Sequence, residues 1–188
     1  HAKVNIDQLI WGGIAKWTCT AVLRRNFLDQ VIDNDPVLHQ SGNFLMGDTQ
    51  VWAELSLISE VAYIPDSLAT YRLLDESASR SKDVIKELRF WKSVHEMRLY
   101  LCNKHKMPEG IRKKEESAWC DQSLRLAFHE RNATLASEVR KKKQAFTWEE
   151  WLRYFGAKHL VFHYVCRAAA LLRNSCFRPA SGMRQIRL

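Results

Sequence analysis

The chain has 188 residues, 46% of them hydrophobic, so it can bury a core as one large domain or as a domain with an appendage. Its formal net charge of +8 favours nucleic acid, an anionic membrane surface or a phosphate-bearing substrate as a partner. Five cysteines without a Cys-x-x-Cys pair exclude a zinc ribbon and a disulfide framework and favour reduced cytosolic thiols, and no apolar run reaches the roughly 20 residues of a membrane-spanning helix.

The first 81 residues alternate short segments and indicate a mixed α and β region. A β-prone run covers Trp17 to Leu23, a turn-rich stretch covers Asn34 to Asn43, and Asp48 precedes an amphipathic helix. Two further apolar runs, Val61 to Ile64 and Leu68 to Leu74, flank a proline-containing turn and are expected to be strands. Because the chain begins at His1 with no apolar leader, we expect a processed or truncated piece.

Residues 82–188 show no strand pattern and predict helices. Ser81 and Asp83 supply a helix start, and apolar residues at steps of three and four then mark one buried face. This face consists of Val84, Leu88, Trp91, Val94, Met97 and Leu101. The segment Pro108-Glu109-Gly110 breaks the pattern.

Three more helical segments are expected after that break. One starts near Ile111 and has Trp119, Leu124 and Phe128 as its apolar side, and the next covers Ala133 to Gln144. Thr147 and Glu150 then have the spacing of a capping box, in which each side chain bonds the other residue's amide, so a further helix begins there.

That last helical region, Trp148 to Asn174, has Gly156 as its expected break point. His159, His163 and Arg167 form a stripe at intervals of four. Two histidines at this spacing can hold a metal, but no third ligand matches them, so a solvated polar stripe is the default interpretation.

Asp48 has two interpretations. An aspartate before a helix caps it by accepting first-turn amide hydrogens, which contributes about 1 kcal/mol of stability. Alternatively, its carboxylate acts as a catalytic base, typically worth about 10²- to 10⁴-fold in rate.

Four segments of the first 81 residues together resemble the acceptor-side half of a family 2 glycosyltransferase of the GT-A fold. In chain order they are TCTAVLRR, GDTQVW, VAYIPDSLA and YRLLDESASRS. The similarity covers about Ile6 to Ser81, and the serine-rich ending is most similar to enzymes that build bacterial surface polysaccharides.

The resemblance implies inverting transfer of a sugar from a nucleotide-sugar to a saccharide or lipid-linked acceptor, with Asp48 as the base that deprotonates the acceptor hydroxyl. The implied acceptor-binding residues are Trp52, Thr18 and Thr20, and the implied diphosphate-binding residues are Arg72, Tyr71, Arg24, Ser77 and Ser79. Helical apolar spacing favours the core as the place of Trp52, and a surface salt bridge is an equal alternative for Arg72.

The resemblance also implies a divalent cation, Mg²⁺ or Mn²⁺, in the complete enzyme, with ligands outside this chain. Asp33-Asn34-Asp35 spells the family's Asp-x-Asp motif, but it follows the basic run and precedes a proline, which favours a turn. Leu74 stands near the position where many members have a histidine, so no metal ligand is assigned there. The nucleotide-binding half is absent from these residues, and we expect this piece alone to be inactive.

The expected architecture is therefore an incomplete α/β GT-A fragment with few strands over residues 1–81, followed by a mainly helical, basic extension over residues 82–188, with helix dominant overall. The extension could bring a cytoplasmic enzyme to the inner face of the cell membrane. The alternatives are a non-enzymatic basic helical module that binds nucleic acid or an anionic membrane surface, and a helical interaction domain.

Overall fold

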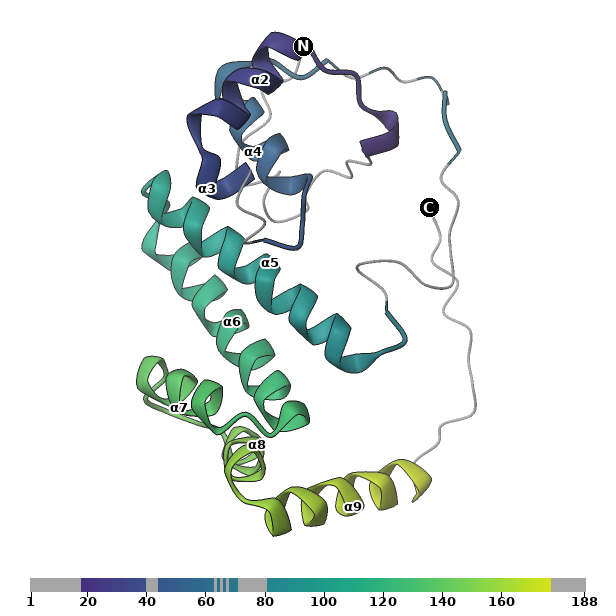
Figure 1. The fold of residues 1–188 in the computed structure, drawn as a ribbon, viewed down its shortest axis with the longest axis vertical. Coiled ribbons are helices and arrows are strands. Elements are labelled where there is room, and N and C mark those ends of the chain that lie inside the picture. Colours follow the sequence, from purple (N-terminus) through teal and green to yellow (C-terminus); the bar gives the residue numbers. More distant parts are fainter. Residues whose placement is uncertain are drawn as a thin grey trace. The chain divides into compact units, whose positions relative to one another are not determined.

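The computed structural model describes residues 18–39, 44–62, 64, 66, 68–70 and 81–176, and the side chains as far as Ala168. Over these residues the chain is mostly helical and forms no β-strand, which confirms that helix dominates (Figure 1). The elements are η1 (Thr18–Thr20), α2 (Arg25–Asn34), α3 (Pro36–His39), α4 (Thr49–Ile58), α5 (Val84–Lys104), α6 (Glu109–Glu130), α7 (Ala133–Lys142), α8 (Trp148–Lys158) and α9 (Leu160–Cys176). None of these helices is long and apolar enough to cross a bilayer.

The strands expected in the first part of the chain are not formed at those of their residues that the structure describes. Thr18–Thr20 is a 3-10 turn, and Val22 beyond it is 98% exposed. Val61 makes a single bridge, and residues 68–70 have no regular structure. A strand needs a neighbour to pair its backbone groups, and the described segments supply no second strand for these runs.

The chain divides into two compact units, residues 1–122 and 123–188, and α6 contributes to both. In unit 1, α2, α3 and α4 pack against one another, and α4 packs against α5. A small apolar core lies where α3, α4 and α5 meet. Its buried members are Leu38, Ala53, Met97 and Leu101, and the partly buried Phe44, Met46, Tyr100 and Met107 pack around them.

Helix α5 begins and faces inward as the sequence predicts. The Asp83 carboxylate accepts hydrogen bonds from the amides of Ile85 and Lys86, which caps the first turn. Four of the six residues of the predicted face are buried, whereas Val84 is exposed at the start of the helix. α5 ends at Lys104 and α6 starts at Glu109, so a break before α6 is confirmed, but Glu109 and Gly110, which the sequence predicts to lie in it, are helical.

Unit 2 contains the end of α6 together with α7, α8 and α9, and α8 packs against both α7 and α9. The predicted capping box is confirmed: the Glu150 amide donates to Thr147 Oγ1 at 3.3 Å, and the Thr147 amide donates to Glu150 Oε2 at 2.8 Å. Aromatic rings gather after α7, where Trp151 contacts Phe146 and Phe155, and the Arg140 guanidinium lies 5.2 Å from the Trp151 ring.

Two details of this unit differ from the sequence prediction. The helical region breaks at His159, not at Gly156. His163 is only 3% exposed, with its ring centroid 4.6 Å from that of Phe128, so the solvated stripe is wrong at this position. Gly156 lies inside α8, where the Phe128 ring fills the space beside it: a Cβ at Gly156 would lie 2.6 Å from Phe128 Cδ2.

Gly156→Ala should therefore destabilise the protein by about 1–3 kcal/mol, since the new methyl group overlaps the Phe128 ring and forces it to move. Gly110→Ala is the matched control. A Cβ at Gly110 meets nothing within 4 Å, so this helical substitution should be neutral or stabilising by up to about 1 kcal/mol. Chemical denaturation followed by circular dichroism checks both, and equal effects would contradict the assignment.

Candidate functional site

Asp48 stands at the N-cap position of α4, but its side chain bonds no backbone amide of the first turn. Instead, Asp48 Oδ2 accepts a hydrogen bond from Thr18 Oγ1 at 3.0 Å, and Oδ1 accepts one from Thr49 Oγ1 at 3.4 Å. The carboxylate is partly exposed, and Thr18 is exposed. The capping interpretation of this side chain is therefore wrong, whereas two of the predicted site residues are brought together.

Trp52 lies one turn further along α4 and is half-buried. Its Nε1 atom is buried, and the described residues offer it no hydrogen-bond partner. The neighbouring Gln50 donates through Nε2 to the Met46 carbonyl at 2.6 Å, while its Oε1 atom is buried and likewise lacks a partner among the described residues. Buried donors and acceptors are usually satisfied, so the first turns of α4 retain unused polar capacity.

The other predicted site residues are either exposed or lie outside the described residues. Thr20 is exposed in η1, and Arg24 is exposed directly before α2. The predicted diphosphate-binding residues Tyr71, Arg72, Ser77 and Ser79 lie outside the described residues. Asp48, Thr18 and Trp52 are therefore the predicted residues whose mutual placement the structure gives.

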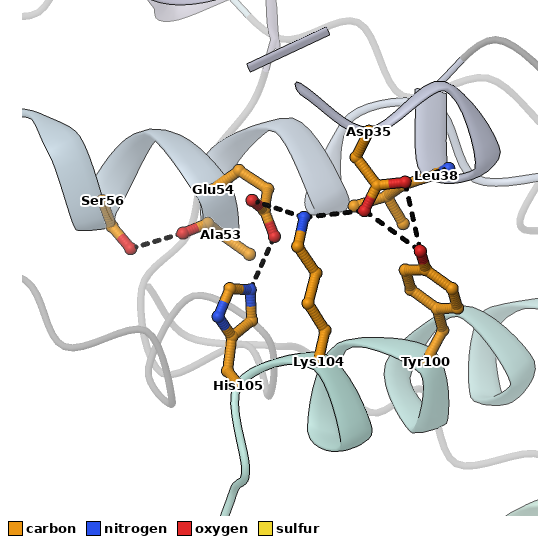
Figure 2. A network of polar contacts seen from close by, with 8 residues as sticks. All are labelled: Asp35, Leu38, Ala53, Glu54, Ser56, Tyr100, Lys104 and His105. Atoms are coloured by element: carbon orange, nitrogen blue, oxygen red, sulfur yellow. Dashed lines mark hydrogen bonds and ion pairs between the residues drawn. The ribbon is translucent and has the colours of Figure 1, made fainter. Parts of the chain in front are cut away.

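A second polar cluster, which we call the Lys104 network, joins α3, α4 and α5 (Figure 2). Figure 2 shows Lys104 rising from α5 between two carboxylates. Its Nζ atom donates to Asp35 Oδ2 at 2.7 Å and to Glu54 Oε2 at 2.9 Å. Tyr100 Oη donates to Asp35 at 3.1 Å, and His105 Nε2 lies 2.6 Å from Glu54 Oε1.

Asp35 is also the N-cap of α3. Its Oδ1 atom accepts the Leu38 amide at 3.0 Å, and Pro36 occupies the first helical position, where its missing N–H costs nothing. Asp35 is 6% exposed. The triplet Asp33-Asn34-Asp35 is thus the end of α2 and the start of α3.

The charges of the Lys104 network stabilise one another. Burial raises the pKa of Asp35, but the hydrogen bonds from Lys104 and the Leu38 amide outweigh it and hold that pKa below its ordinary value. Burial lowers the pKa of Lys104, and the bonds to Asp35 and Glu54 reverse this, so its pKa is raised. Burial and the bond to Asp35 raise the pKa of Tyr100. All three groups keep their ordinary charge at neutral pH.

His39 lies within electrostatic reach of this network. Burial lowers its pKa, although Glu54 and Asp35 act in the opposite direction, so the ring is neutral at pH 7. Its Nε2 atom is buried, with no hydrogen-bond partner in the part of the chain that can be described.

The Lys104 network is suited to holding helices together. Each carboxylate accepts a hydrogen bond from Lys104 and contacts a second side chain, Tyr100 for Asp35 and His105 for Glu54. The Lys104 ammonium group lies between the two acids, in the position that a metal ion bound by both would need. Across the described ranges, no group of three or more His, Cys, Asp or Glu residues has a metal-binding arrangement.

The sequence interpretation did not identify the Lys104 network. One signal was present: Asp35 followed by Pro36 is a typical helix start. A second was the spacing of Tyr100 and Lys104, which puts two polar side chains on one face of α5 beside Met97 and Leu101. Neither signal indicates which residue of another helix the side chain will contact.

Comparison with protein-family models, with curated proteins and with solved structures found no match to this chain.

Lys104→Met should destabilise the protein by about 3 kcal/mol, because it leaves the Asp35 and Glu54 carboxylates facing each other without a cation. The lower end of the range for buried pairs applies, since the Lys104 side chain is 29% exposed. Lys113→Met is the control: it removes a 3.8 Å ion pair with Glu109 at the surface and should cost less than about 0.5 kcal/mol. Denaturant titration measures both, and similar losses would refute the central role of Lys104.

The free energy of unfolding should depend on pH through the ionisation of Asp35. Because its folded pKa is lowered, its contribution is present above the unfolded value of 3.8 and is lost as pH falls through the folded value. Lys104 has a raised pKa, so its contribution is present below 10.5 and disappears as pH rises through the folded value.

Asp35→Asn keeps the shape of the cap and removes the charge. The difference in unfolding free energy between the native protein and this variant should be constant near neutral pH and shrink below pH 3.8. Denaturant titrations at a series of pH values measure this difference. A difference that did not change with pH would show that the Asp35 charge contributes nothing.

Proposed function

We propose that this protein takes part in inverting glycosyl transfer, with Asp48 as the base that accepts the proton of the acceptor hydroxyl. The single observation that carries the proposal is the 3.0 Å hydrogen bond from Thr18 to Asp48. It joins two segments, TCTAVLRR and GDTQVW, that the sequence resemblance assigned to one site. The resemblance rests on the sequence alone and the contact on the fold, and the two therefore support the proposal independently.

The geometry of Asp48 suits a base. A carboxylate that caps a helix uses its lone pairs on backbone amides, whereas among the described residues Asp48 bonds two hydroxyl groups and no first-turn amide. Each carboxylate oxygen has two lone-pair directions, so with respect to the described residues both oxygens keep one acceptor position for an incoming hydroxyl. In the reaction the acceptor oxygen attacks the anomeric carbon, its proton passes to Asp48, and the nucleoside diphosphate leaves.

The surroundings of Asp48 offer groups that could orient a saccharide. The exposed hydroxyl-bearing Thr18 and Thr20 lie in η1, and the Trp52 ring follows Asp48 by one turn of α4. A sugar hydroxyl is a suitable acceptor for the Trp52 Nε1 atom, which has no partner among the residues that the structure describes, provided that the ring turns toward the site.

The donor side of the site is proposed from the resemblance alone. Arg24, Tyr71, Arg72, Ser77 and Ser79 would bind the diphosphate, and Mg²⁺ or Mn²⁺ would be held by ligands outside this chain. The α/β character of the GT-A fold would then depend on pairing with strands that are not among the described residues. The proposed setting is bacterial surface polysaccharide synthesis on the cytoplasmic side of the membrane.

Asp48→Asn tests the base. Asn keeps the size of the side chain and still accepts the Thr18 hydrogen bond, but it cannot take a proton at neutral pH. In the complete protein the turnover of nucleotide-sugar and acceptor, measured as nucleoside diphosphate release, should fall by at least about 10²-fold. Thermal stability should change by less than about 1 kcal/mol, because no capping bond is lost.

Asp33→Asn is the matched control, since Asp33 is an exposed acid of the Asp-x-Asp triplet. Its turnover should equal that of the native protein. Unchanged turnover in Asp48→Asn, or an equal loss in both variants, would remove the assignment of Asp48.

A further inference from the structure

The first two turns of α9 present an apolar face to solvent. Val161, Tyr164 and Val165 share this face at helical spacing, and Leu160 borders it. Their exposed fractions are 46% for Leu160, 77% for Val161, 59% for Tyr164 and 58% for Val165. His163, on the opposite side of the helix, is 3% exposed and packs on Phe128. The helix thus uses its other side for packing within unit 2 and leaves its apolar face outward.

The segment of chain that carries this face has charges of one sign. The sequence contains no Asp or Glu after Glu150. The basic residues after that point are Arg153, Lys158, Arg167, Arg173, Arg178, Arg184 and Arg187. Lys158 and Arg167, which directly flank the face along the chain, are both exposed. An apolar face on a segment whose charged residues are all basic is complementary to a surface that combines hydrocarbon with negative charge.

We propose that the exposed face of α9, Leu160–Val161–Tyr164–Val165, binds the surface of an anionic lipid bilayer. The valines and Leu160 enter the boundary between headgroups and acyl chains, Tyr164 lies at the headgroup level, and Lys158 and Arg167 contact lipid phosphates. A second copy of the chain is a poorer occupant, because it brings the same positive charges to the contact. Nucleic acid matches the charge but leaves the apolar side chains in water.

This inference depends on the geometry of unit 2 and is independent of glycosyl transfer. The full chain is sedimented with vesicles of phosphatidylcholine and with vesicles that also contain phosphatidylglycerol. It should bind the anionic vesicles and not the neutral ones, and added salt should weaken binding because it screens the basic residues.

Two variants separate the apolar and the electrostatic contributions. Val161→Gln with Val165→Gln should lower partitioning at least about tenfold, because two exposed apolar groups are removed. Arg167→Gln should lower it about fivefold on anionic vesicles only. Val22→Gln, at an exposed valine of unit 1, is the control and should bind as the native chain does. Circular dichroism confirms that each variant is folded.

The possible outcomes distinguish the occupants. Vesicle binding that the double variant loses and Val22→Gln retains supports the proposal. Equal binding to neutral and anionic vesicles, or no binding, overturns it. A concentration-dependent dimer that the double variant abolishes, without vesicle binding, would assign the face to a second copy. Binding to an RNA homopolymer without vesicle binding would assign the basic residues to nucleic acid.

Discussion

The ammonium group of Lys104, held between the carboxylates of Asp35 and Glu54, is the interaction on which the arrangement of α3, α4 and α5 depends (Figure 2). The apolar core beneath it is small: among the described residues its buried members are Leu38, Ala53, Met97 and Leu101. Apolar contacts are not directional, so such a small core fixes the distance between helices better than it fixes their rotation. The hydrogen bonds of Lys104 are directional and fix the rotation of the helices relative to one another. They hold α4 against α5.

The same interaction explains why two acids can lie so close together. A buried carboxylate costs several kcal/mol unless it is paired and hydrogen-bonded, and two unpaired carboxylates would repel as well. Each carboxylate of the Lys104 network therefore has more than one partner: Asp35 accepts from Lys104, Tyr100 and the Leu38 amide, and Glu54 contacts Lys104 and His105. This full satisfaction makes the network a device for specifying one arrangement of helices. Asp48, at the N-terminal end of α4, is not part of the network.

Unit 2 reaches its fold by another route. Its helix starts are set locally, by Asn132 for α7 and by the Thr147 capping box for α8. Its packing is aromatic, with Phe128 covering His163 and with Trp151 between Phe146 and Phe155. Gly156 is needed where the Phe128 ring approaches the backbone of α8. These contacts use the inner side of α9 and leave the opposite side apolar and exposed.

The sequence by itself determined the helical character of residues 82–176 and most helix ends, because amphipathic spacing and capping act over three or four residues. Asp83, Pro108 and the Thr147 capping box are where local reasoning placed them. Only the tertiary structure decided the roles of the two aspartates: Asp35 caps a helix and binds Lys104, whereas Asp48 bonds Thr18. The partners of Asp35 on α5 lie 65 and 69 residues away, and no local pattern specifies such a pair. The β-prone run near Thr18 shows the same limit, since a strand exists only when another segment pairs with it.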